Sequence, residues 1–196
     1  MHITVATGNP DKIQEISDII KDYPNLDIHL DTIAGLKIPE PDEPYDNFIE
    51  NACHKAKYYA QFTKAPTLSE DAGLCIETLD EFPGVKTKDF MLECGGLPQS
   101  FKKLEQMLEG KTNLRAWFTC AAALYIPEQE LLITHQASDY GRMSFPARGD
   151  KGFGFDPVFI PDGYEQTMGE LGHVVKNKIG HRAQAIRGVV EQLLYT

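Results

Sequence analysis

The sequence predicts a mixed α/β fold, in which helices flank a β-sheet. Short apolar segments that suit strands are interspersed with segments whose apolar residues recur every three to four positions, as in amphipathic helices. The two types do not follow a strict strand–helix–strand series, which favours a mixed rather than a purely parallel sheet. At 196 residues the chain has the length of one domain, with room for two lobes. We therefore predict a single domain over residues 1–196.

Composition indicates an ordinary globular protein, with 42% hydrophobic and 24% charged residues. No apolar run approaches the ~20 residues of a membrane span, and the N-terminus does not resemble a signal peptide. We therefore expect a cytoplasmic protein without a membrane partner. The four cysteines lack zinc-ligand spacing and are expected to be buried thiols. A net charge of −10 argues against a nucleic-acid partner.

The first elements are a strand at residues 2–6 and a helix that follows it directly. Asn9 can cap this helix, and Pro10 suits its first position. Gly8 would let the backbone approach a ligand, and the free amides at the helix start would attract an anion. With Lys12 beside them, these groups predict a phosphate site. An ordinary turn with a surface lysine would use the same residues.

A strand at residues 26–30 is expected next, followed by an irregular loop at 37–44. Three prolines exclude regular structure in this loop, and its acidic residues make it a candidate metal-facing segment. Apolar residues at helical spacing then predict a helix over about residues 46–62. Lys55 lies on the inner half of this helix, where spacing alone does not distinguish a functional lysine from a surface one.

The next segment carries two adjacent acids. Residues 67–69 read as a short strand that ends at Glu70 and Asp71, followed by a glycine. This pattern would place at least one carboxylate in a cleft, where Mg²⁺ could be held by one or two acids together with substrate phosphates. An aspartate beside the ion could also take a proton from an attacking water. A solvated acidic turn is the alternative.

The later elements are expected to be one helix, two paired strands and a final helix. A helix around residues 101–108 is closed by Gly110. Residues 116–126 form a long apolar strand that can pair with residues 131–136. The final helix is expected over about residues 177–194, where apolar residues again share one face.

Two further segments are unusual. Glycine and phenylalanine alternate within residues 149–157, either because a flat base stacks there or because a bulged strand buries its phenylalanines. Basic residues gather at 176–182, at the predicted start of the last helix, where the helix dipole disfavours cations. An anionic or carbonyl-bearing ligand would compensate, although a solvated basic turn would also fit. Arg182 offers a planar fork and Lys176 a point charge.

The order of these segments resembles the inosine triphosphate pyrophosphatase family over nearly the whole chain. The matching segments are TGNPDK, IPE, NFIENACHKA, SEDAGL, FPG, GFGFDPVFIPDGYEQT and KNKIGHRAQAI. The resemblance implies Mg²⁺-dependent hydrolysis of ITP, dITP or XTP to the monophosphate and pyrophosphate. It further implies an elongated sheet with two lobes around a central substrate cleft, and a homodimer.

The resemblance also implies roles for individual residues. Asp71 would bind the metal and activate the water that attacks the α-phosphorus, with Glu40 as a second ligand. The triphosphate would contact Thr7, Gly8, Asn9, Pro10, Asp11, Lys12 and Lys55. The base would be held by Phe153, Gly154, Phe155, Asp156, Lys176, His181 and Arg182. Ala72, also expected at the substrate, stands where many members carry Ser or Thr, and residues 86–90 depart from the usual pattern.

Two other functions use the same features. One is a metal-dependent phosphohydrolase that releases orthophosphate from another nucleotide, and the other is a nucleotide-sensing module without turnover. Asp71 argues against the module, because binding alone does not require a water-activating acid. The pyrophosphatase requires that Lys12, Asp71 and Arg182 surround one crevice.

Overall fold

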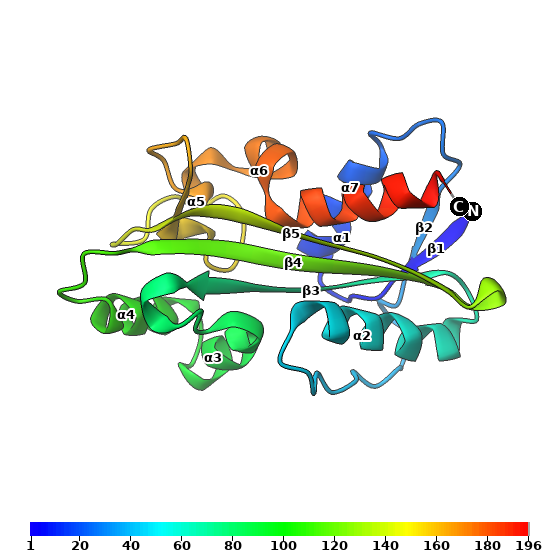
Figure 1. Cartoon of the computed structure of the whole chain (residues 1–196), viewed down its shortest axis with the longest axis horizontal. Coiled ribbons are helices and arrows are strands. Elements are labelled where there is room, and N and C mark those ends of the chain that lie inside the picture. Colours follow the sequence, from blue (N-terminus) through cyan, green and yellow to red (C-terminus); the bar gives the residue numbers. More distant parts are fainter. Residues whose placement is uncertain (196) are drawn as a thin grey trace. The chain divides into compact units, whose positions relative to one another are not determined.

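The computed structural model describes residues 1–195 and contains one six-stranded sheet, drawn in Figure 1. The strands are β1 (His2–Val5), β2 (His29–Thr32), β3 (Thr67–Ile76), β4 (Arg115–Ile126), β5 (Leu131–Met143) and β6 (Phe159–Pro161). Their order in the sheet is β2-β1-β3-β4-β5-β6. β1 pairs in parallel with β2 and β3, whereas β5 and β6 are antiparallel. The predicted mixed α/β fold is confirmed.

Seven α-helices and four short 3₁₀ turns lie among the strands in residues 1–195. The helices are α1 (Pro10–Ile20), α2 (Phe48–Thr63), α3 (Thr87–Glu93), α4 (Leu97–Met107), α5 (Met168–Leu171), α6 (His173–Ile179) and α7 (His181–Leu193). The 3₁₀ turns are η1 (Glu77–Leu79), η2 (Gly84–Lys86), η3 (Pro127–Gln129) and η4 (Asp156–Val158). Within the described residues, each helix is too short or too polar to cross a bilayer.

The chain divides into two compact units. Unit 1 comprises residues 1–71, residues 120–137 and the segment from Arg182 to the C-terminus, and unit 2 comprises residues 72–119 and 138–181. The long strands β3, β4 and β5 each contribute residues to both units. Neither unit is therefore a continuous stretch of chain.

In unit 1, helices contact both faces of the sheet. Ala52 and Ala56 of α2 pack on Ala121 and Ala123 of β4, and these small side chains allow close approach. Cys120 precedes Ala121 and points to the other face, where its Sγ contacts a carboxylate that also binds α7.

Unit 2 has its own hydrophobic core. Its members come from β3, α3, α4, β4, β5 and the segment around β6, and they include Leu74, Ile76, Phe90, Leu104, Phe118, Met143, Phe155, Val158 and Phe159. Gly73 marks a close approach of backbone in this unit, because a Cβ there would lie 2.1 Å from the carbonyl oxygen of Gly84. β3 and the η2 turn therefore meet where a side chain would not fit.

The structure corrects several predicted boundaries. β2 begins at His29 rather than at residue 26, and the strand predicted at 131–136 extends to Met143. The strand predicted at 67–69 continues to Ile76, because its acidic residues are buried through ion pairs instead of ending the strand. The single final helix is wrong: α6 and α7 are separated at Gly180, whose backbone is extended.

Candidate active site

The predicted anion site at the start of α1 has the expected local geometry. The Asn9 side chain accepts a hydrogen bond from the Asp11 amide at 2.9 Å, and Pro10 occupies the first turn. The Asn9 amide donates to Thr7 Oγ1 at 3.1 Å. Around Gly8 the space is open, since a Cβ there would meet no described atom within 4 Å. These contacts confirm the cap and leave the glycine backbone accessible.

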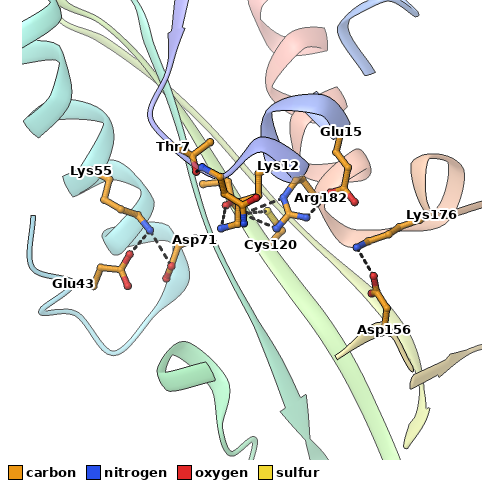
Figure 2. Close-up of polar contacts among 12 residues, drawn as sticks. Thr7, Lys12, Glu15, Glu43, Lys55, Asp71, Cys120, Asp156, Lys176 and Arg182 are labelled. Atoms are coloured by element: carbon orange, nitrogen blue, oxygen red, sulfur yellow. Dashed lines mark hydrogen bonds and ion pairs between the residues drawn. The ribbon is translucent and has the colours of Figure 1, made fainter. Parts of the chain in front are cut away.

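Glu70 and Asp71 lie inside β3, and both are buried at 6% exposure. Successive side chains of a strand point to opposite faces of the sheet. Glu70 accordingly contacts residues of α1 and α7. Asp71 contacts Lys55 of α2 (Figure 2). The two adjacent acids thus belong to two different groups of side chains.

The first group surrounds Asp71. Lys55 Nζ donates to Asp71 Oδ1 at 3.1 Å and also forms an ion pair with Glu43 (Figure 2). Asn51 Nδ2 donates to Asp71 Oδ2 at 3.2 Å. The helix α2 supplies both Lys55 and Asn51 from one buried face, one turn apart. Asp71 is therefore held by a cation and an amide.

Sequence reasoning singled out Glu40 in the acidic loop and missed Glu43. The structure brings the Glu43 carboxylate to Lys55. Glu40 is exposed, and its negative charge adds to the effect of burial in raising the pKa of Tyr59. Spacing could not distinguish the two acids, because the loop has no regular periodicity. A role for Glu40 as a metal ligand stays a prediction.

The electrostatics of this group favour an ionised lysine beside a basic carboxylate. Burial and the negative charge of Glu43 raise the pKa of Asp71, although Lys55 opposes the shift. Burial would lower the pKa of Lys55, but the charges of Asp71, Glu70 and Glu43 outweigh burial and raise it. A carboxylate with a raised pKa is a better proton acceptor near neutral pH.

Asp71 and Glu43 also have the donor chemistry of a magnesium site. The Lys55 ammonium pairs with both carboxylates, so the two acids lie close enough to share one cation. Mg²⁺ takes one or two protein carboxylates and completes its shell with water and substrate phosphates. Within residues 1–195, no three His, Cys, Asp or Glu side chains form a preassembled metal cluster. Two carboxylates fit a metal that arrives with a phosphate ligand.

The second group surrounds Glu70. Lys12 Nζ pairs with Glu70 Oε1, and Arg182 donates to Glu70 Oε2 at 3.3 and 3.4 Å. Arg182 also donates to Glu15 Oε2 at 2.6 Å. Burial opposes ionisation of Glu70, but Arg182 and Lys12 outweigh it and hold its pKa well below the usual value. Glu70 is therefore a buried carboxylate shared by two cations.

In unit 2, three of the predicted base-binding residues, Phe153, Asp156 and Lys176, form a third group. Asp156 Oδ2 accepts hydrogen bonds from the Phe153 amide at 2.9 Å and from Lys176 Nζ at 2.7 Å. The Lys176 ammonium lies 3.8 Å from the centre of the Phe153 ring. His181 stacks on Phe118 with 4.9 Å between ring centres. This group combines aromatic faces with a fixed cation.

The two phenylalanines of the glycine-rich segment have different environments. Phe153 is half-buried beside Lys176, but Phe155 belongs to the core of unit 2 and packs edge-to-face on Phe101 at 5.7 Å. The segment consists of turns and not of a bulged strand. Gly152 is required next to Asp156, because a Cβ there would lie 2.2 Å from Oδ2.

The basic cluster is not placed as the sequence predicted. Lys176 and Lys178 lie in the last turn of α6, where the helix dipole favours cations, so the predicted penalty does not apply to them. His181 and Arg182 begin α7. Arg182 belongs to unit 1 with Lys12, Lys55 and Asp71, whereas Lys176 and His181 belong to unit 2. The crevice expected to gather all of them stays a prediction.

Comparison with known proteins identifies the family of the chain. A family model described as the Ham1 family matches residues 3–192. A dITP/XTP pyrophosphatase of Zymomonas mobilis is 34% identical over 197 residues, which cover 98% of this chain and 91% of the relative. One of Ignicoccus hospitalis is 35% identical and covers 95% of this chain and 94% of its own. The solved HAM1 protein of Coxiella burnetii aligns over 100% of both chains with a TM-score of 0.88 and 28% identity. On these grounds the chain belongs to the Ham1 family.

Proposed function

We propose that this protein hydrolyses ITP, dITP and XTP to the nucleoside monophosphate and pyrophosphate, with Mg²⁺ as cofactor. Its class, a nucleoside triphosphate pyrophosphatase, is the one named for its relatives from Zymomonas and Ignicoccus. The observation that carries the proposal is the buried Asp71, held by Lys55 next to Glu43. The reaction would serve the cytoplasmic nucleotide pool.

In this proposal Asp71 takes the proton of a water that attacks the α-phosphorus. The bond between that phosphorus and its bridging oxygen breaks, and pyrophosphate leaves. Lys12 and the first amides of α1 bind the phosphate oxygens, since a helix N-terminus favours anions. Bound Mg²⁺, held by Asp71 and Glu43, would supply charge neutralisation at the phosphates. Lys55 would hold both carboxylates in place.

The third group would select the base. Phe153 offers a ring on which a purine can stack, and such stacking contributes about 1–3 kcal/mol per base in nucleic-acid complexes. Lys176 and His181 can donate hydrogen bonds to the 6-oxo oxygen of hypoxanthine or xanthine. Arg182 binds Glu15 and Glu70 in the second group, and its contact with the base stays a prediction. Adenine carries an amino group at that position, which would leave the donor unpaired. Buried donors discriminate strongly against such a mismatch.

We further propose that the protein is a homodimer whose subunits meet along the outward face of α2. Tyr45, Ile49 and Phe62 on or beside this face are 39%, 38% and 51% exposed. A hollow of about 390 Å³ lies along it, lined by α2 residues between Glu50 and Gln61 and by Tyr45. An apolar, partly aromatic face of this kind is typical of an interaction surface.

The charge pattern of this face supports a second copy of the chain as the partner. Glu50 and Lys57 are seven residues apart, so they lie on the same side of α2 after about two turns. Two α2 helices that pack antiparallel about a two-fold axis near His54 would bring Glu50 opposite Lys57 of the partner subunit. Such an isologous interface uses the same face on both subunits.

A panel of nucleotides tests the proposed reaction. The protein is incubated with Mg²⁺ and ITP, dITP, XTP, ATP or GTP, and pyrophosphate is resolved from orthophosphate. We expect pyrophosphate and monophosphate from the first three and much slower turnover of ATP. Orthophosphate with the diphosphate would instead identify a phosphohydrolase. Binding without products would identify a sensing module.

A further inference from the structure

We propose that Glu70 is a positioning residue, which holds the Lys12 ammonium in the orientation that receives the triphosphate. The inference rests on the proposed function, because it assigns Lys12 a phosphate ligand. It separates the roles of two acids that are adjacent in sequence: Asp71 acts at the metal and the water, whereas Glu70 contacts neither and acts by holding Lys12 and the helix that carries it.

The contacts of Glu70 leave little capacity for another ligand. Its Oε1 accepts from Lys12, while its Oε2 accepts from Arg182 Nε at 3.4 Å and Nη2 at 3.3 Å. Cys120 Sγ lies 3.5 Å from the same Oε2. The carboxylate side chain is 3% exposed. A metal or a reacting water would have to displace a buried cation to reach it.

The direction of the side chain supports the same conclusion. Glu70 contacts Lys12 of α1 and Arg182 of α7 and so points to the face of β3 that meets these helices. Asp71 points to α2 (Figure 2). Alternation along a strand prevents both side chains from facing one site unless the backbone bulges. Glu70 therefore does not share the position that Asp71 and Glu43 offer to Mg²⁺.

A closed ring of ion pairs fixes the helix that carries Lys12. Lys12 and Glu15 lie three residues apart on α1, about one turn. Lys12 binds Glu70 of β3, Glu70 binds Arg182 of α7, and Arg182 returns to α1 through Glu15 at 2.6 Å. Lys12 attaches the first half of α1 to β3 directly, and Glu15 attaches it through Arg182. The helix start, with its phosphate-facing amides, is thereby anchored.

Lys12 differs from the other members of the ring in its exposure. Its side chain is 28% exposed, whereas those of Arg182, Glu15 and Glu70 are 5% exposed or less. The ammonium is therefore held by Glu70 on its buried side and can meet an incoming phosphate on its exposed side. A free lysine side chain has many rotamers, and restricting them before binding lowers the cost of binding.

A double-mutant cycle between Glu70 and Lys12 tests the proposal. The variants are Glu70→Gln, Lys12→Gln and the pair, assayed for pyrophosphate release from dITP. We expect Glu70→Gln to raise KM by about tenfold while kcat changes by less than about twofold. In the Lys12→Gln background the same substitution should change KM little, because its target is already absent. Glu128→Gln, on the exposed turn after β4, controls for loss of a carboxylate.

Magnesium dependence distinguishes positioning from metal binding. Glu70→Gln should leave the Mg²⁺ concentration for half-maximal rate unchanged, whereas Asp71→Asn should raise it or abolish turnover. Metal-free affinity for pyrophosphate, measured by calorimetry, should fall about tenfold in Glu70→Gln and in Lys12→Gln alike. If Glu70→Gln does not fold, Glu70→Asp keeps the charge on a shorter side chain and should raise KM by a smaller factor.

The outcomes separate this inference from the proposed function. Suppose that the wild-type enzyme is active. Additive effects of the two substitutions on KM, or a shifted Mg²⁺ requirement in Glu70→Gln, would then overturn the positioning role alone. A wild-type protein that releases no pyrophosphate from any 6-oxo purine nucleotide would overturn the proposed function, and this inference with it.

Discussion

At the residue scale, one peptide bond separates two chemical environments on β3. Asp71 has a raised pKa because burial and Glu43 oppose its ionisation, whereas Glu70 has a lowered pKa because two cations outweigh its burial. Acids with different pKa values in one site are suited to different tasks. In the proposed reaction, Asp71 is therefore the proton acceptor and Glu70 the fixed counter-charge.

Asp139 of β5 is a third buried acid, and its surroundings do not compensate its charge. It is 6% exposed, and its Oδ2 has no hydrogen-bond partner among the residues that the structure describes. Burial, with the charges of Asp162 and Asp156, raises its pKa to about 7, although Lys176 acts in the opposite direction. The folded state therefore keeps a proton on Asp139 between about pH 4 and pH 7, where the unfolded chain has lost it.

The sign of the effect on stability follows from this difference. The folded state binds more protons in that window, so the free energy of unfolding falls as pH rises from about 4 to 7. We predict that Asp139→Asn raises Tm at pH 8 by about 3 °C or more and changes it little at pH 5. Calorimetry at the two pH values checks this, with the exposed Asp150→Asn as control. Equal shifts at both pH values would contradict the assignment.

At the element scale, the sequence predicts the start of a helix correctly where neighbouring residues alone determine it. The Asn9 cap and Pro10 fixed the start of α1, because both act through their own backbone neighbours. The sequence analysis did not predict the break between α6 and α7, although a glycine, Gly180, lies at this position. Apolar spacing on both sides of this glycine is continuous enough to imitate one helix.

β3 was predicted too short for a different physical reason. Adjacent acids normally end a strand, because burying an unpaired charge is costly. Here the partners Lys12, Lys55 and Arg182 come from three helices that are distant in sequence. Such long-range compensation leaves no local signal, and for the same reason Glu43 could not be distinguished from Glu40.

The outward face of α2 yields a prediction at the same scale. Glu50→Lys or Lys57→Glu alone would place like charges opposite each other across a two-fold axis, so each variant should be monomeric. The double variant, with the charges exchanged, restores opposite pairs and should recover the dimer. Sedimentation velocity distinguishes these states, and Glu128→Lys serves as control for a charge reversal elsewhere. A monomeric wild type, or a double variant that does not recover, would contradict this interface.

At the scale of the whole molecule, each compact unit carries part of the proposed chemistry. Unit 1 contains the phosphate-binding start of α1 and both acids, and unit 2 contains the aromatic and basic group for the base. Motif order in the sequence predicted the family and the mixed sheet, since both depend on the succession of segments. Motif order could not predict which distant side chains contact one another, because these contacts depend on how the strands align in the sheet.

Oxygen-isotope labelling tests the central claim, that Asp71 activates a water for attack on the α-phosphorus. dITP is hydrolysed with Mg²⁺ in water enriched in ¹⁸O, and the products are analysed by mass spectrometry. We predict one ¹⁸O atom in the monophosphate, none in pyrophosphate, and no labelled product with Asp71→Asn. Label in pyrophosphate or orthophosphate, or undiminished labelling by Asp71→Asn, would contradict the account.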